Sequence, residues 1–233
     1  MTRRPSSRDA ILAAAVAEFA AHGFRGATVD AIARRARLNK AMIYYHFDDK
    51  LALYLEILRG IFSVMRDRSA AIVASSTTPR EKIAAFIDAL GSEADARPHL
   101  PRLMMREIAD DARRLDPPTL PIMAGVFQNL RAILDEGFEK GAFRRVNPMV
   151  AYFQIVAPTL FFRAAAPLRE AMSRQGLAEL RMEASAFSEN LKDSALQALA
   201  AGRPEAGTRA AKPRRAPEAP APKARSATTG DRP

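Results

Sequence analysis

The residues best suited to chemistry lie within positions 28–50, and that chemistry is contact with nucleic acid. If Ile43 faces inward on a helix, steps of about 100° per residue turn a distinctive set of side chains outward or to the flanks. This set is Ala41, Met42, Tyr44 and Tyr45. A small residue lets a helix approach the major groove, a methionine touches a thymine methyl, and tyrosine hydroxyls reach phosphate oxygens. Lysine and glutamate would be expected on a plain solvated face.

Lys50 gives a second indication of an anionic partner. Asp49 precedes it as the expected helix cap, so Lys50 falls in a first helical turn, where the helix dipole disfavours a cation. A DNA phosphate would supply the missing partner, helped by the backbone amides of the helix start. The alternative is an ion pair with Asp48 or Asp49.

Two short helices joined by a tight turn must position these side chains. Apolar residues repeat at three/four spacing in the first helix, at Val29, Ile32, Ala33 and Ala36. Thr28 and Asn39 stand where side-chain oxygens cap the two helices. Ile43 and Phe47, four residues apart, anchor the second helix, and Leu38 fills the turn between them. This pattern predicts a helix-turn-helix.

At these residues the sequence resembles the TetR/AcrR family of bacterial transcriptional regulators. The matching positions are Phe19, Gly23, Phe24, Thr28, Ile32, Ala33, Ala36, Ile43, Tyr44, Phe47 and Lys50. The resemblance implies phosphate contacts from Thr28, Tyr44, His46 and Lys50, and groove contacts from Asn39, Lys40, Met42 and Tyr45. Two residues depart from the family pattern. Arg37 replaces the usual turn glycine and must adopt a left-handed conformation, and Met42 replaces a common hydroxyl residue.

The amino-acid composition limits the classes of protein to which this chain can belong. The chain has 233 residues, 48% of them hydrophobic, and contains no cysteine, which excludes disulfides, thiolate catalysis and cysteine metal sites. An enzyme is the main alternative class, but the three histidines, His22, His46 and His99, are scattered, and the sequence has no phosphate-binding glycine loop or nucleophile elbow. We therefore expect no catalytic residues, no metal site and no cofactor.

Positive charge is concentrated at the two ends of the chain. Of the net +10, residues 1–50 hold nine basic and five acidic side chains, and residues 202–233 hold eight basic and three acidic ones. This distribution suits DNA better than an anionic membrane, which would call for a strongly cationic amphipathic helix. The basic arm Thr2–Arg4 is either a disordered terminus or a DNA contact that follows the phosphate backbone or enters a minor groove. The segment 202–233 should be a disordered basic tail, either simply solvated or adding nonspecific DNA affinity.

The middle of the chain should form a larger helical domain. Apolar periodicity predicts a helix from Lys50 to near Arg68 and further helices over about 79–90, 99–111, 122–138, 149–162 and 177–201. A capping box, Ser6 with Asp9, opens the first helix of the chain, and Thr78 with Glu81 forms another. The longest nearly uncharged apolar run, residues 149–162, is too short to span a bilayer, so we expect a soluble protein with no membrane partner. The absence of cysteine is consistent with a reducing compartment, so we expect it to be cytoplasmic.

The last two expected helices favour a homodimer. Residues 149–162 are apolar almost all round, and such a helix needs cover on more than one side. Together with a final helix through Phe187, it would form a four-helix contact across a twofold axis. We therefore expect dimerisation through the two C-terminal helices.

An effector pocket is expected inside the larger domain, among Phe86, Met104, Met105, Phe127 and Phe153. The alternative is a filled core with no cavity. Arg106 and Glu107 either orient a ligand there or form a surface salt bridge.

The sequence therefore predicts an all-α fold with an N-terminal three-helix helix-turn-helix DNA-binding domain over 1–50. A larger helical ligand-binding and dimerisation domain follows over 51–201, and a basic tail over 202–233. The predicted function is a homodimeric transcriptional regulator, a repressor that binds a palindromic operator on double-stranded DNA and is released by a small apolar or amphipathic effector. The alternative is a ligand-independent DNA-binding dimer or an activator.

Overall fold

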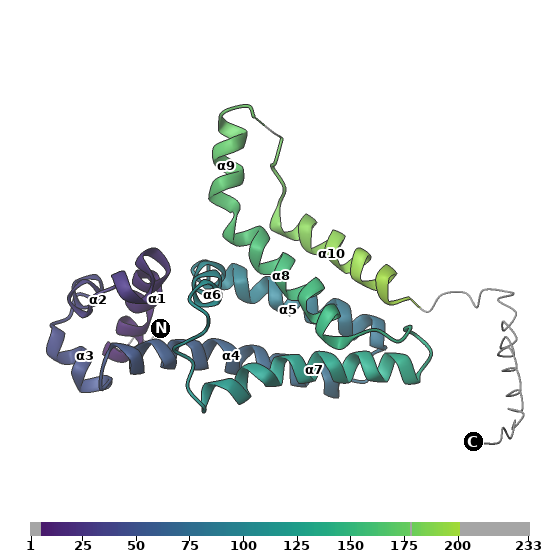
Figure 1. Ribbon diagram of the computed structural model, residues 1–233, viewed down its shortest axis with the longest axis horizontal. Coiled ribbons are helices and arrows are strands. Elements are labelled where there is room, and N and C mark those ends of the chain that lie inside the picture. The colour runs from purple at the N-terminus through teal and green to yellow at the C-terminus, as the bar shows by residue number, and fades with distance from the viewer. Residues whose placement is uncertain (1–5, 178, 201–233) are drawn as a thin grey trace, which may run out of the picture. The chain divides into compact units, whose positions relative to one another are not determined.

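The computed structural model describes residues 6–177 and 179–200, and its named secondary structure is entirely helical within that part of the chain. The helices are α1 Ser7–Gly26, α2 Val29–Ala36, α3 Lys40–His46, α4 Lys50–Ala74, α5 Pro79–Ala96, α6 Leu100–Ala109, α7 Thr119–Glu139, α8 Pro148–Ala164, α9 Ala166–Arg174 and α10 Ala184–Leu199 (Figure 1). The all-α prediction is confirmed. The described residues, 6–177 and 179–200, belong to one compact unit, so the boundary at residue 50 falls within it and stays a prediction. The arm Thr2–Arg4 and the tail 202–233 lie outside the described residues.

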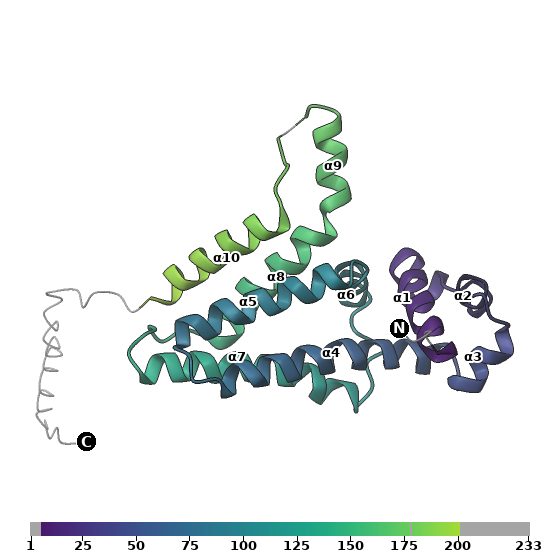
Figure 2. The same cartoon turned by 180° about the vertical axis from the view of Figure 1, so that it is seen from behind.

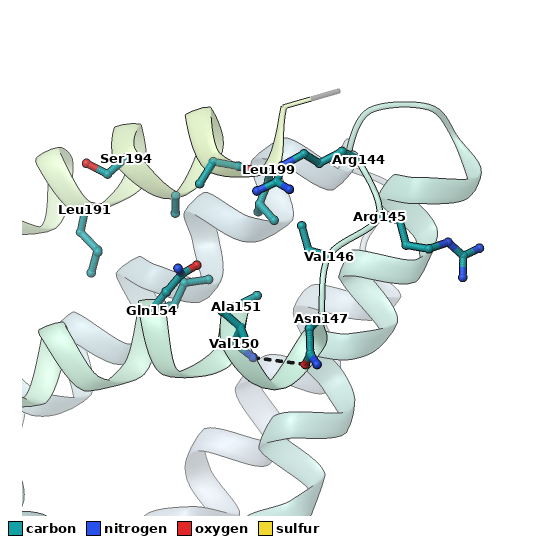
Figure 3. A pocket seen from close by; sticks show the side chains of 13 residues that line it. Arg144, Arg145, Val146, Asn147, Val150, Ala151, Gln154, Leu191, Ser194 and Leu199 are labelled. Atoms are coloured by element: carbon teal, nitrogen blue, oxygen red, sulfur yellow. Dashed lines mark hydrogen bonds between the residues drawn. The ribbon is translucent and has the colours of Figure 1, made fainter. Parts of the chain in front are cut away.

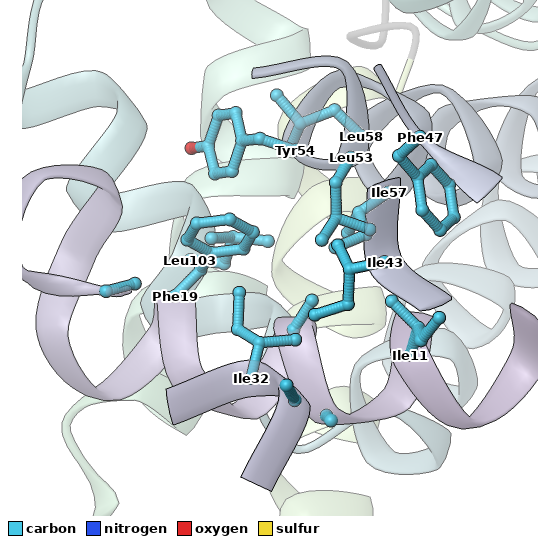
Figure 4. Close-up of a cluster of buried hydrophobic side chains, with 14 of the residues drawn as sticks. Ile11, Phe19, Ile32, Ile43, Phe47, Leu53, Tyr54, Ile57, Leu58 and Leu103 are labelled. Carbon is cyan, nitrogen blue, oxygen red and sulfur yellow. The ribbon is translucent and has the colours of Figure 1, made fainter. Parts of the chain in front are cut away.

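The first three helices, α1–α3, share a core with the start of α4 and one face of α6. The predicted capping box holds, since Ser6 accepts a hydrogen bond from the backbone of Asp9 and the Asp9 side chain accepts one from the backbone of Ser6. The largest side chains of this core come from five helices, α1, α2, α3, α4 and α6, and Figure 4 shows Ile11, Phe19, Ile32, Ile43, Leu53, Tyr54 and Leu103 among them. Phe24 folds back on it, with its ring stacked on Phe19 and edge-on to Tyr54. We call Ser7–His46 the DNA-binding head, after the function that the sequence predicts for it.

The remaining helices form a second core. α4 and α7 lie side by side along most of their length, α5 and α8 pack against this pair, and α10 covers α5 and α8 (Figures 1 and 2). The buried apolar residues come from all five helices, for example Met65, Ile83, Phe86, Ile87, Val126, Leu130, Ile133, Ile155 and Leu199. α6 contacts both α1 and α8, and therefore connects the DNA-binding head with the second core.

Three helix boundaries differ from the prediction. α4 continues past Arg68 to Ala74, where buried Ser69 accepts a hydrogen bond from Asn129 of α7 at 2.8 Å. α5 continues through Gly91 to Ala96, so this glycine does not end the helix. It instead permits close packing, since a Cβ there would lie 3.1 Å from Nη2 of Arg163. The last helix begins at Ala184 instead of residue 177, since Gly176, at φ +68°, ends the unpredicted helix α9.

No single helix among the described residues has the length and apolar composition needed to cross a membrane. The bent pair α8 and α9 meets the length and composition criteria only when the two helices are taken together across a 50° bend.

Candidate nucleic-acid interface

Caps and turn geometry fix α2 and α3 as expected. Thr28 Oγ1 accepts from the amide of Ala31 at 3.1 Å, and Asn39 Oδ1 accepts from the amide of Met42 at 2.9 Å. Arg37 takes the left-handed conformation that its turn position demands, with φ 58° and ψ 38°. The helix-turn-helix geometry is therefore confirmed down to the predicted caps.

The two faces of α3 are also as predicted. Ile43 and Phe47 are buried, whereas Tyr45 is 79% exposed and Tyr44 is 49% exposed. Ala41 is exposed, and Met42 is half-buried beside it. α3 thus presents a small residue and two aromatic hydroxyls outward on a rigid, core-anchored helix.

Several predicted contact residues already have partners within the chain. His46 Nε2 lies 2.7 Å from Ser7 Oγ, which ties the end of α3 to the start of α1. Lys40 donates to Asp30 at 3.1 Å, and this hydrogen bond, followed by the charge of Asp30, raises the pKa of Lys40. These hydrogen bonds restrict the orientations of the His46 and Lys40 side chains.

Lys50 corrects the argument made from its position in the sequence. Its ammonium donates to the carbonyl oxygens of Phe24 at 2.9 Å and Ala27 at 3.0 Å, and it lies 4.5 Å from the centroid of the Phe24 ring. The expectation of a charge with no partner in the chain is wrong, and so is the alternative ion pair with Asp48 or Asp49. Carbonyls around the end of α1 hold the cation that the dipole of α4 disfavours. A phosphate contact from Lys50 remains a prediction.

Three further cations near α2 were not singled out from the sequence. Arg25, Arg34 and Arg37 are exposed, and no carboxylate of the described residues pairs with them. The spacing of Arg34 and Arg37, one helical turn apart, was the available signal. Unpaired arginines close to an exposed recognition helix are suited to contacts with phosphate.

The five residues predicted for the effector pocket do not line one cavity. Phe86 is fully buried between the helices of the second core, and Met105 and Phe153 line an open groove beside α9. Phe127 packs edge-on to Tyr152, with ring centroids 5.6 Å apart. Only Met104 borders a small cavity of about 60 Å³ between α4, α5, α6, α7 and α8.

That small cavity is mostly apolar. Its lining consists of Ile61, Phe62, Met65, Leu90, Glu93, Leu100, Met104, Val126, Tyr152, Val156 and Leu160. The carboxylate of Glu93 forms ion pairs with Arg68 and Arg97. Tyr152 is the other polar side chain of the wall, and burial raises its pKa. The cavity therefore suits a hydrophobic group with few polar atoms.

Arg106 and Glu107 do neither of the two things expected of them. Arg106 donates to the carbonyl oxygens of Ala20 at 3.1 Å and Ala21 at 2.9 Å, in α1. Glu107 is buried and accepts a hydrogen bond from the hydroxyl of Tyr54. Arg106 thus joins α6 to α1 of the DNA-binding head, and Glu107 joins α6 to α4.

An apolar face runs along α8, α9 and α10. Phe153, Phe161 and Leu168 are more than half exposed there, and the rings of Phe162 and Phe187 stack at 4.0 Å. The wall of this groove carries almost only apolar side chains. We call it the α8–α10 face. Exposed apolar surface of this kind typically marks a protein contact.

A second groove lies between α8 and α10, near the α7–α8 loop (Figure 3). It has a volume of about 500 Å³, and its lining mixes apolar residues with Asn147, Gln154 and Ser194. At its rim, Arg144 Nε donates to the carbonyl of Ala198 at 2.7 Å and so ties the loop to the end of α10. Most of the lining is solvent-exposed, unlike that of the small cavity.

Two family models match this chain. Residues 11–57 match the bacterial regulatory proteins of the tetR family, and residues 79–190 match the tetracyclin repressor-like C-terminal domain. The first match covers the helix-turn-helix, and the second covers α5 to α9 and the start of α10, which include every wall of the small cavity except α4.

Curated proteins similar in sequence to this chain are helix-turn-helix transcriptional regulators. The HTH-type transcriptional repressor SCO4008 of Streptomyces coelicolor is 37% identical over 106 residues, which are 45% of this chain and 52% of that protein. The chain thus spans about half the length of this relative. The HTH-type transcriptional repressor NicS of Pseudomonas putida is 25% identical over 158 residues, covering 67% of this chain and 74% of that protein.

Solved structures share the fold. The ketosteroid transcriptional regulator KstR2 of Mycobacterium tuberculosis superposes with a TM-score of 0.66 at 23% identity, covering 85% of this chain and 97% of that one. The regulator FadR from Bacillus subtilis, solved in complex with stearoyl-CoA, gives 0.64 at 19% identity, covering 82% and 98%.

Proposed function

This chain belongs to the TetR family of bacterial transcriptional regulators, and we propose that it is a homodimeric repressor that leaves its operator when a small apolar or amphipathic effector binds. The observation that carries the proposal is the exposed outer face of α3 on a capped, core-anchored helix-turn-helix. We assign DNA binding to residues 1–50, effector binding and dimerisation to 51–201, and an accessory basic role to the tail 202–233. The family consists of regulators rather than enzymes, and we propose that this member works in the cytoplasm.

DNA recognition would use the outer face of α3. Ala41 allows close approach to the major groove, and Tyr45, the most exposed aromatic residue of this helix, reaches base edges or phosphates. The exposed arginines Arg25, Arg34 and Arg37 would add phosphate contacts beside it. Phosphate contacts would fix the register of the helix, and base contacts would select the sequence.

Dimerisation would cover the α8–α10 face. Phe161 and Leu168 are 65% and 63% exposed, which is costly for a single chain in water and ordinary at a subunit contact. A twofold dimer buries the same patch on each subunit. It would also present two copies of α3 to one side of a DNA duplex, as a palindromic operator requires.

Effector binding would use the small cavity. Its volume of about 60 Å³ holds only a few atoms, whereas ligand pockets usually span about 300–1,000 Å³. An effector must therefore push the walls apart, and Met104 and Leu100 of α6 form one of these walls. The printed names of KstR2 and of the FadR complex with stearoyl-CoA support an effector with a large apolar part.

Selection of bound genomic fragments tests this function. The purified protein should enrich a pseudo-palindrome whose half-sites lie about 34–36 Å apart, one turn of DNA. Ala41→Glu is the matched variant, since it places a negative charge on the exposed face of α3 without touching the core. It should enrich no fragment. A wild-type protein that enriches no sequence, or an Ala41→Glu protein that enriches the same sequence, contradicts the proposal.

A ligand-independent DNA-binding dimer is the second candidate, and the small volume of the cavity favours it. Titration of the operator complex with apolar and aromatic compounds separates the two functions. A compound that lowers operator affinity supports the repressor, and a complex that no compound shifts supports the ligand-independent dimer.

A further inference from the structure

Arg106 joins the helix that lines the small cavity to the first helix of the DNA-binding head. Its Nε donates to the carbonyl of Ala20 at 3.1 Å, and its Nη2 donates to the carbonyl of Ala21 at 2.9 Å. The residues are 85 and 86 positions apart in the chain. The planar guanidinium group donates to two successive carbonyls from two different nitrogens, whereas a lysine has only one nitrogen from which to donate.

A break in α1 makes these carbonyls available. Gly23 has φ 69° and ψ 174°, which is not helical, although the helix resumes as far as Gly26. In an unbroken helix the amides of Phe24 and Arg25 would bond to Ala20 and Ala21. A non-helical residue at position 23 is incompatible with these two regular bonds, and Arg106 supplies side-chain donors to both carbonyls, as a cap does at a helix C-terminus.

Gly23 also makes room for the arginine. A Cβ at this position would lie 3.2 Å from Nη1 of Arg106, closer than an ordinary van der Waals contact. The positive φ of Gly23 independently disfavours any other residue. The glycine and the arginine therefore form one unit, in which the first breaks the helix and the second caps it.

The opposite face of α6 meets the cavity. Met104 lines it, and two residues along a helix correspond to a rotation of about 200°, so Met104 and Arg106 point to nearly opposite sides. A group that enlarges the cavity by pushing Met104 thus moves Arg106 against the end of α1. α1 in turn packs against α2 and α3, which carry the interface with DNA.

We propose that Arg106 is a positioning residue: it transmits the state of the cavity wall to the DNA-binding head by capping the broken end of α1. The inference rests on the proposed function, because it assigns a route by which effector and operator influence each other. It places the link in α1 and α6, in addition to the direct continuation of the head into α4.

Thermodynamic reciprocity allows a test without an effector. If effector and operator binding are coupled, operator binding must change the affinity of the cavity for an effector by the same factor by which the effector changes operator affinity. Bound operator must therefore alter the conformation or stability of the cavity wall. The probe is therefore the operator fragment itself, and the readout is amide hydrogen exchange of α6 in the full-length protein.

Arg106→Gln is compared with Arg102→Gln. Arg102 lies on the same helix, is exposed and has no partner among the described residues, so its loss changes charge equally without touching α1. In the wild type and in Arg102→Gln, operator should slow exchange in residues 100–109 by about fivefold or more, the lower end of typical coupling. In Arg106→Gln most of this slowing should be lost. Equal slowing in all three proteins overturns the inference.

Two further measurements keep the result unambiguous. Circular dichroism and thermal unfolding show whether Arg106→Gln is folded, and if it is not, Arg106→Lys is used, which keeps the charge and loses the two-point grip. Arg106→Lys should then also lose most of the slowing, and full slowing contradicts the proposal. If the wild type binds no operator, the proposed function fails instead, whereas an Arg106→Gln protein that binds operator and shows the same slowing of α6 exchange as the wild type refutes only the role of Arg106.

Discussion

The hydroxyl of Tyr54, on α4, donates a hydrogen bond to the buried carboxylate of Glu107, on α6. Arg114 approaches the same oxygen of Glu107 at 3.5 Å and also pairs with Asp110 at 2.8 Å. The other oxygen, Oε1, is buried and has no hydrogen-bond partner. A buried carboxylate with so few partners depends strongly on each of them.

Tyr54→Phe should therefore destabilise the protein. Removing the hydroxyl leaves Glu107 with one long contact to Arg114, and an unsatisfied buried group costs about 1–3 kcal/mol. Chemical denaturation at pH 7 measures the change. Tyr152→Phe is the control, because the Tyr152 hydroxyl has no hydrogen bond within the described residues, and its loss should change stability little. Equal effects of the two substitutions would contradict the importance of the bond to Glu107.

The stability of the wild type and of the two phenylalanine variants should also differ in its dependence on alkaline pH. Burial, followed by the hydrogen bond to Glu107, raises the pKa of Tyr54 far above its usual value, and burial also raises that of Tyr152. In the unfolded chain a tyrosine ionises near pH 10, so each contributes stability fully below about pH 10 and loses it as pH rises further. The wild type should lose stability above pH 10 more steeply than either phenylalanine variant, by up to about 1.4 kcal/mol per pH unit per tyrosine. If the free energy of unfolding falls equally steeply above pH 10 in the wild type and in both variants, this prediction is contradicted.

Lys50→Met should have two separable effects. Loss of the bonds to the carbonyls of Phe24 and Ala27 should lower stability by about 1.5–3 kcal/mol, the range for hydrogen bonds of charged groups. If Lys50 also contacts phosphate, the salt dependence of DNA binding should fall by about one unit. Lys40→Met is the control for stability, since Lys40 is exposed and pairs only with exposed Asp30. A lower stability with an unchanged salt slope would leave Lys50 a purely structural role.

Tyr45→Ala tests base recognition by α3. Tyr45 is 79% exposed, so its removal should leave folding unchanged. If it meets base edges, operator affinity should fall by about 1–3 kcal/mol while affinity for random DNA changes little. Competition binding with both duplexes measures the difference. Equal losses on the two DNAs would reduce Tyr45 to a backbone contact.

Phe161→Asp tests the α8–α10 face. Phe187, the position suggested by sequence alone, stacks on Phe162, so a charge there would also damage the fold. Phe161 is 65% exposed, and an aspartate should instead prevent association of two apolar faces. Sedimentation should show a monomer with weakened operator binding. Leu120→Asp, at a half-exposed residue of α7 away from this face, should remain dimeric. A dimeric Phe161→Asp protein would place the subunit contact elsewhere.

Met104→Trp tests the effector cavity. Filling a space of about 60 Å³ should blunt any response of the operator complex to apolar compounds, at a cost of about 1–3 kcal/mol for overpacking. Met105→Trp, one residue along and facing the open groove, should keep the response. The titration with apolar and aromatic compounds is repeated on both proteins. A response that is lost with Met105→Trp and kept with Met104→Trp would move the site to the groove.

Local patterns in the sequence determined the helix-turn-helix. The caps Thr28 and Asn39, the inward pair Ile43 and Phe47, and the outward tyrosines all follow from residue type and helical spacing, and the structure has each in its expected place. Such features depend on neighbours within one or two turns, which sequence periodicity reports directly. The left-handed turn at Arg37 was predictable for the same reason.

Only the tertiary structure decided what the long-range polar side chains do. Lys50, Arg106 and Glu107 looked like an unpaired cation and a ligand-binding or surface pair, yet their partners lie on other helices, between 23 and 86 positions away. The effector cavity likewise depends on five helices meeting, and neighbouring Met104 and Met105 face different spaces. Helical spacing gives the direction of a side chain on its own helix, but the group it meets is set by how helices pack, and no local pattern encodes that.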